Sequence, residues 1–153
     1  MTPITNIIKP VIKAADMLSP VIDLIIRIWM ANIFWKSGLA KISDWPHTLD
    51  LFKYEFKVPI FPPDVAAVLA TTSELGCSVL LVIGLATRLS SGMLMFLTFM
   101  AAISYHLGAP DASTSWGEGY LSHIYFEMLL AVILLHGPGK LSIDHFIRKK
   151  FMH

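Results

Sequence analysis

Cysteine and charged residues are both scarce in this chain of 153 residues. Cys77 is the only cysteine, which excludes a disulfide within the chain and dithiol redox chemistry of the C-x-x-C type. Only 15% of the residues are charged, where soluble domains carry roughly a quarter, and 55% are hydrophobic. The net charge of +1 gives no reason to expect nucleic acid as a partner. The composition is typical of an integral membrane protein, whose first partner is the lipid bilayer.

Four apolar stretches are long enough to cross a bilayer, which takes about 20 helical residues. They cover residues 20–41, 64–86, 89–107 and 119–136, and prolines or glycines stand near most of their ends. No internal repeat separates the chain into parts. The sequence therefore predicts an all-α integral membrane fold, with residues 1–153 as a single transmembrane domain. Its expected architecture is a four-helix up-down transmembrane bundle.

The distribution of Lys and Arg predicts the orientation of this bundle. Four spans put both termini on one side of the membrane, and that side carries seven Lys and Arg residues against three at the opposite end. The positive-inside rule then places both termini, with the basic tail over residues 140–153, in the cytoplasm. The expected location is the cytoplasmic (inner) membrane of a bacterium, with the long loop over residues 42–63 on the outer side.

Two shorter helical patterns lie outside the predicted spans. In the outer loop, Leu49, Phe52 and Phe56 recur at helical spacing, which indicates either a helix on the membrane surface or a lid over an outward-facing site. In the basic tail, Ser142 is placed to cap a short helix with the sequence IDHFIRKKF. The basic residues of that helix would either meet anionic lipid headgroups or form a solvated end.

Charged residues inside the spans point to one site. Glu74 is the only charged residue in its apolar run, and an ionised side chain at the bilayer centre costs roughly 2.5–3.5 kcal/mol, so such a residue usually has a partner. At about 1.5 Å per residue, the outer half of the membrane contains Lys36, Glu74, His123 and Glu127, with His106 close to the outer surface. Similar depths on different helices predict one pocket that opens outward. The alternative is a charge network with a purely structural role.

Helical spacing assigns these residues to faces and to candidate roles. His123 and Glu127 share a face of the last span, as Asn32 and Lys36 do on the first. The candidate catalytic residues are Glu74, Lys36 and Glu127, with Lys36 as the cation that pairs with Glu74. The candidate cofactor-binding residues are His123, Asn32 and Tyr120. Asp23 and Arg27, four residues apart in the inner half, are expected to form a structural ion pair or to clamp a lipid phosphate.

Three functions use the same pocket. In the first, a quinone head group enters from the lipid, His123 and Lys36 donate hydrogen bonds to its carbonyl oxygens, and Glu74 or Glu127 relays protons. In the second, His106, His123 and Glu127 bind a transition metal, because imidazole and carboxylate suit iron, zinc or copper. In the third, the protein is a non-catalytic accessory or scaffold subunit of a redox or metal-handling complex.

Three segments of the chain resemble the DoxX family of small four-span bacterial membrane proteins. They are LIIRIWMANIFWKSGLAKI in the first span, SELGCSVLLVIGLATRLS around Glu74, and the closing GPGKLSID. The resemblance implies a redox setting, since relatives are associated with thiosulfate–quinone oxidoreduction and with complexes that handle superoxide and thiol stress. It favours an oxidoreductase subunit or an accessory subunit without choosing between them. So thin a bundle also suggests a homodimer or protein partner subunits.

Overall fold

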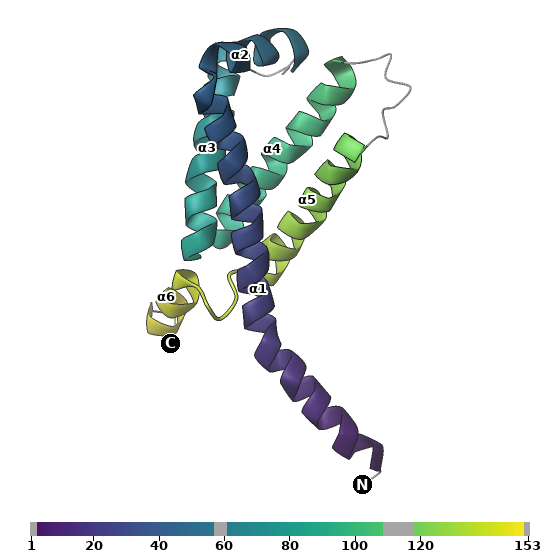
Figure 1. Cartoon of the computed structure of the whole chain (residues 1–153). Helices are drawn as coiled ribbons and strands as arrows, with labels where there is room; N and C mark the ends of the chain where they lie inside the picture. The colour runs from purple at the N-terminus through teal and green to yellow at the C-terminus, as the bar shows by residue number, and fades with distance from the viewer. Residues whose placement is uncertain (1–2, 57–60, 109–117, 152–153) are drawn as a thin grey trace.

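The fold of the described residues is all-helical, as the sequence predicts. The computed structural model describes residues 3–56, 61–108 and 118–151, and these ranges contain helices and turns but no strand. In chain order the helices are α1 (Pro3–Ser43), α2 (Trp45–Asp50), the π-helix η1 (Leu51–Glu55), α3 (Pro63–Ile83), α4 (Thr87–Gly108), α5 (Glu118–His136) and α6 (Ile143–Phe151) (Figure 1).

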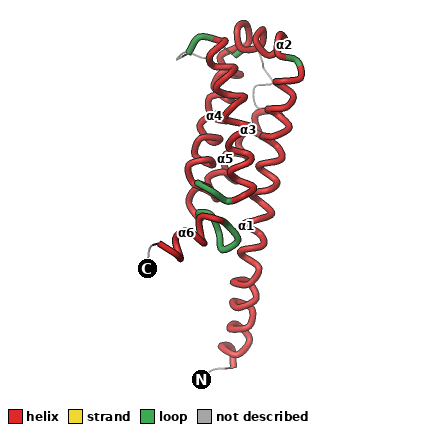
Figure 2. The backbone as a smooth tube through the Cα atoms, turned by 90° about the vertical axis from the view of Figure 1, so that its left-hand side faces the viewer, coloured by secondary structure: helices red, strands yellow, loops and turns green. Residues whose placement is uncertain are grey.

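The four long helices α1, α3, α4 and α5 form a bundle in which each runs antiparallel to the next in the chain. α1 packs mainly against α3, and α4 packs mainly against α5. The two pairs come together at the end next to α6 and diverge toward the end covered by α2 (Figure 1). A view turned by 90° shows the long helices of the bundle running in nearly the same direction, with α2 across one end (Figure 2). We call the end next to α6, where the helices converge, the closed end, and the end next to α2, where they diverge, the open end.

An apolar core fills the closed part of the bundle. Its fully buried side chains come from all four long helices and include Met30, Leu81, Leu94 and Leu130. α1 and α3 approach closely at Gly38, where an added Cβ would lie 2.7 Å from carbons of the Leu75 side chain. Small residues at such contacts allow helices to pack closely in membranes, where the hydrophobic effect does not drive helices together.

α1 begins well before the predicted start of the first span. The sequence placed Pro20 in the opening turn of a helix, whereas α1 starts at Pro3 and continues through both Pro10 and Pro20. Each proline removes one backbone hydrogen bond, but the neighbouring turns keep the helix continuous. At about 1.5 Å per residue, α1 is about 60 Å long, roughly twice the thickness of a bilayer core. Its first turns extend beyond the bundle (Figures 1 and 2).

The outside of the bundle is apolar. Large side chains with exposed surface occur on each long helix, for example Ile25, Val79, Phe99 and Leu135. Within the described residues, Ile12–Ser43 and Pro63–Ile83 are long and apolar enough to cross a membrane, and α4 and α5 contain shorter apolar segments. Such a surface suits contact with lipid acyl chains rather than with water.

The predicted helical pattern in the outer loop is confirmed as α2 and η1. The Asp44 carboxylate accepts a hydrogen bond from the His47 amide at 3.1 Å, and the Thr48 hydroxyl donates to the Lys41 carbonyl at 3.0 Å. These bonds hold α2 across the end of α1. Phe52 of η1 is buried against Ala66 and Ala67 of α3, so this segment covers the open end of the bundle.

Candidate functional site

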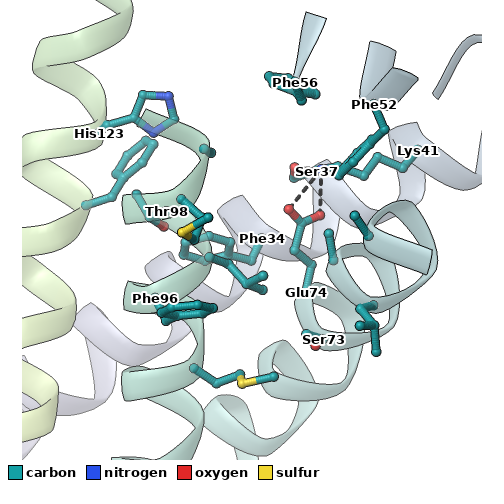
Figure 3. Close-up of a pocket in the computed structure, with 18 of the residues that line it drawn as sticks. Phe34, Ser37, Lys41, Phe52, Phe56, Ser73, Glu74, Phe96, Thr98 and His123 are labelled. Atoms are coloured by element: carbon teal, nitrogen blue, oxygen red, sulfur yellow. Dashed lines mark hydrogen bonds and ion pairs between the residues drawn. The ribbon is translucent and has the colours of Figure 1, made fainter. Parts of the chain in front are cut away.

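A cavity of about 540 Å³ occupies the open half of the bundle. Its walls come from α1, η1, α3, α4 and α5, with Phe61 at one edge. The aromatic lining consists of Phe34, Phe52, Phe56, Phe61, Phe96 and Phe126. The polar lining consists of Ser37, Lys41, Ser73, Glu74, Thr98 and His123 (Figure 3). An apolar cavity with a few polar groups is the usual form of a small-molecule site.

The cavity wall formed by α1 and α3 carries an ion pair. The Lys41 ammonium donates to both Glu74 carboxylate oxygens, at 2.8 and 2.7 Å, and to the Ser37 hydroxyl at 2.8 Å. The three acceptors match the three donors of an ammonium group. The two charged side chains are 21% and 11% exposed. The pair is thus fixed in position and nearly neutral as a unit, which makes its presence among apolar side chains tolerable.

The predicted pairing of Glu74 with Lys36 is wrong, because Lys41 holds that place. Lys36 and Asn32 are exposed on the outer face of α1 and do not line the cavity. The inward face is marked by Arg27, Phe34 and Lys41, which are seven residues apart and therefore lie nearly in line along a helix. This spacing is visible in the sequence. It was missed because Lys41 stands at the end of the predicted span, from which its long side chain reaches back inward.

His123 faces the cavity from α5, across from the ion pair (Figure 3). Its Nδ1 atom is buried and has no hydrogen-bond partner within the described residues, and its ring packs edge-on to Phe126. Glu127 lies one turn further along α5, half-buried and outside the cavity lining, with Oε1 also unpartnered there. The structure therefore brings Glu74 and His123 to one cavity and leaves Glu127 beside it. The catalytic and binding roles of these residues stay predictions.

The predicted metal-binding set of His106, His123 and Glu127 includes one side chain, that of His106, whose position is not described. His106 belongs to α4 and Tyr120 to α5, but the positions of their side chains are not described. Among the described residues, no group of three His, Cys, Asp or Glu side chains is placed to hold a metal ion. His123 and Glu127 alone would supply two ligands, so the metal interpretation stays a prediction.

The cavity has a side opening between α3 and α4. Leu69 of α3 and Met93 and Phe96 of α4 all line the cavity, yet they are 43%, 43% and 51% exposed. Side chains that face both the cavity and the outside mark its rim. This rim is apolar and lies on the long side of the bundle.

Comparison with known proteins identifies the family of this chain. The family profile described as DoxX matches residues 22–107, more than half of the chain. This chain belongs to the DoxX family. The chain is also 32% identical over 131 residues to an uncharacterized protein of Haemophilus influenzae, and the match covers 84% of each protein. No solved structure matches this chain. The family is membrane-associated, so this DoxX protein is a membrane protein, in agreement with its apolar helices.

In this DoxX protein, the segments that carry the resemblance meet at the closed end of the bundle. Arg27 is 1% exposed, and its guanidinium donates to the Leu141 carbonyl. The Asp144 carboxylate accepts hydrogen bonds from the amides of Ala86 and Thr87, at 2.9 and 2.8 Å, and its own amide donates to the Gly84 carbonyl at 3.0 Å. Residues from the first helix, the α3–α4 turn and the closing segment thus form one network. The sequence did not predict this network, because the residues that it joins are 50 or more positions apart.

The predicted ion pair of Asp23 with Arg27 does not form as a direct contact. Within the described residues, Lys41–Glu74 is the ion pair at contact distance. Arg27 turns instead toward the loop after α5, where both Asp23 and Asp144 still act on its charge electrostatically. Asp23 lies against Gly139, whose added Cβ would come within 3.1 Å of the carboxylate. The helical spacing of Asp23 and Arg27 was correct, but it could not reveal that the Arg27 guanidinium donates to the Leu141 carbonyl in a distant loop.

Proposed function

We propose that this DoxX protein is a multi-pass protein of the bacterial inner membrane that binds a quinone head group in its cavity. It would act as a redox-associated subunit, and the electrons would pass between the quinone and a partner protein. The observation that carries this proposal is the cavity itself. It combines an aromatic lining, an ion pair on one wall, an imidazole on the other and an apolar opening on its side.

The cavity lining suits the two parts of a quinone. The flat ring is apolar and packs well against aromatic side chains, and six phenylalanines among the described residues line the cavity. Its two carbonyl oxygens accept hydrogen bonds. The buried Nδ1 atom of His123 has no hydrogen-bond partner in the described part of the chain, and Ser73 adds a hydroxyl to the lining. An isoprenoid tail would leave through the opening at Leu69, Met93 and Phe96 into the acyl chains.

Glu74 and Lys41 are the groups proposed to handle protons at this site. A quinone takes up two electrons and two protons when it is reduced, so its pocket needs groups that exchange protons. The Lys41 ammonium donates two of its hydrogen bonds to the Glu74 carboxylate oxygens and the third to the Ser37 hydroxyl. A ligand that competes for Lys41 would free the carboxylate to accept a proton. Glu127, one turn from His123, is the proposed next group on the α5 side.

The proposed membrane placement uses α1, α3, α4 and α5 as four spans. The long outer loop with α2 would face the periplasm, and both termini would face the cytoplasm. The basic residues support this orientation, because α6 and the start of α1 lie at the same end of the molecule (Figure 1). The cavity is then in the outer half of the bundle, as its position next to α2 indicates.

The experiment that tests this function measures quinone bound to the purified protein. Detergent-purified protein would be extracted with organic solvent and its quinone content determined by mass spectrometry, followed by titration with a short-chain quinone. We expect quinone with the wild type and with Lys36→Met, and at least several-fold weaker binding with Lys41→Met and His123→Ala. Wild-type protein without extracted quinone and without binding in the titration would contradict the proposal.

A second candidate function is an accessory subunit, and the outer face of α1 favours it. Asn32 and Lys36 are exposed there beside Trp29. Polar side chains on the outer face of a membrane helix are costly in lipid and usually have a partner. A second copy of the chain or another subunit would provide one. Protein free of quinone and of metal by elemental analysis, yet stably bound to a redox enzyme, would favour this function over the first.

A further inference from the structure

The C-terminal helix α6 has an apolar face that no described part of the chain covers. Ile143, Phe146, Ile147 and Phe151 are spaced so that they share one face, and Phe146 and Phe151 are 65% and 73% exposed. The last turn is basic, with Arg148, Lys149 and Lys150. An amphipathic helix with basic residues and exposed aromatic side chains is suited to the interface between lipid headgroups and acyl chains.

The start of α6 is firmly attached to the bundle. Asp144 binds the amides of Ala86 and Thr87, and the Ser142 hydroxyl accepts the amide of His145 at 3.1 Å, which confirms the predicted helix cap. The rest of the helix points away from the bundle axis at the closed end (Figure 1). The exposed face of α6 is therefore held at one place relative to the long helices.

We propose that α6 docks on the anionic lipid surface at the end of the bundle. Its four apolar side chains enter the boundary between headgroups and acyl chains, and its three basic side chains contact lipid phosphates. Charge complementarity favours this occupant over a protein partner, because the basic cluster is next to the apolar face on a helix placed at the ends of the proposed spans. The inference rests on the proposed four-span placement, since that placement brings the membrane surface to α6.

Docking at this site would also reach the α3–α4 turn. Asp144 belongs to the first turn of α6, and its carboxylate caps the start of α4. The two helices joined by this turn are the ones that diverge to form the side opening of the cavity. A lipid surface that fixes α6 would thereby fix the start of α4.

Hydrogen exchange of the full-length protein in nanodiscs tests the proposal. The protein is placed in nanodiscs of phosphatidylcholine alone or with phosphatidylglycerol, and exchange of the α6 amides is followed by mass spectrometry. A basic side chain at an anionic surface contributes roughly five-fold, so three should slow exchange on the order of 100-fold in the anionic discs. The two leaflets of a nanodisc have the same composition, so the result does not depend on which way the termini face in the cell.

Two variants separate docking from other causes of protection. The triple variant Arg148→Gln, Lys149→Gln and Lys150→Gln should lose the effect of the anionic lipid, whereas Lys9→Gln with Lys13→Gln, at the same end of the molecule, should keep it. Equal α6 exchange in both kinds of disc, or an unchanged response in the triple variant, overturns the proposal. Protection that appears in detergent and rises with protein concentration also overturns it, because a second copy would then cover the helix. None of these outcomes depends on quinone binding.

Discussion

At the scale of single residues, the reach of a lysine side chain decides the composition of the site. Lys36 is nearer than Lys41 to the depth of Glu74, and it shares a helix face with Asn32, so the sequence favoured Lys36 as the partner. The side chain of Lys41 nevertheless folds back along α1 and meets both oxygens of Glu74, while Lys36 points outward. The depth of a residue along a span follows from counting residues. Its rotation about the helix axis depends on which face of the helix packs against the bundle. In the sequence, the only sign of the inward face of α1 was the seven-residue spacing that ends at Lys41.

The Lys41–Glu74 pair leads to the first prediction. Lys41→Met should destabilise the protein by about 1–3 kcal/mol, because it leaves the Glu74 carboxylate in the cavity wall without its partner. The midpoint of thermal unfolding in detergent measures this loss.

Matched variants on the same helix serve as controls. Lys36→Met removes the same charge from an exposed position and should change the midpoint little. The double variant Lys41→Met with Glu74→Leu should regain most of the stability, since apolar residues of similar volume often replace a buried ion pair without loss. A Lys36→Met variant as unstable as Lys41→Met would show that the loss has nothing to do with the pair.

At the scale of helices and turns, the sequence predicted the elements better than their contacts. α3, α4 and α5 lie within a few residues of the predicted spans, because prolines and glycines mark those ends. The start of α1 was missed, since Pro20 looked like a first-turn residue and the helix in fact passes through it. The network of Arg27, Gly84 and Asp144 was not predictable from local pattern, because its members belong to separate elements.

The α3–α4 turn leads to the second prediction. Gly84 ends α3 with φ of +69°, and an added Cβ would lie 2.9 Å from Cα of Ser142 and also against the Arg27 guanidinium. Gly84→Ala should therefore cost at least about 2 kcal/mol, from backbone strain together with the clash. Unfolding in detergent measures the change.

Gly76 offers the matched control on the same helix. An added Cβ there has no atom of the described residues within 4 Å. Gly76→Ala should be neutral or stabilising by up to about 1 kcal/mol, because alanine is the better helix former. Similar losses at Gly76 and Gly84 would mean that the turn is not as constrained as the contacts with Ser142 and Arg27 indicate.

At the scale of the whole molecule, the sequence indicated that side chains from different helices share one pocket, but it did not reveal the shape of the cavity. Glu74 and His123 were placed at similar depth on different helices, and both line one cavity. The sequence could not show that the two helix pairs diverge toward the end covered by α2, because that arrangement depends on contacts between elements far apart in the chain. Phe52 and Phe56 were recognised as a helical pattern, but their place in the cavity wall required the fold.

The proposed orientation leads to the third prediction, made in a Cys77→Ser background. A cysteine at Asp50, on the exposed side of α2, should react with a membrane-impermeant maleimide in intact spheroplasts. A cysteine at Lys149, exposed on α6, should react only after the membrane is permeabilised. Labelling detected on gels gives the side of each residue. Reaction of both positions in intact spheroplasts, or the reverse pattern, would contradict the proposed topology.

The rim formed by Leu69, Met93 and Phe96 has a consequence for how strongly a ligand needs to be held. A molecule that arrives through this rim diffuses within the plane of the bilayer and never has to dissolve in water. The concentration of a hydrophobic compound in the bilayer far exceeds its solubility in water, so even weak binding would keep the cavity occupied. Rapid exchange with the surrounding pool then becomes compatible with high occupancy. An affinity measured for ligand dissolved in water would overstate the affinity for ligand that is already in the bilayer, because it includes the favourable transfer of apolar surface out of water.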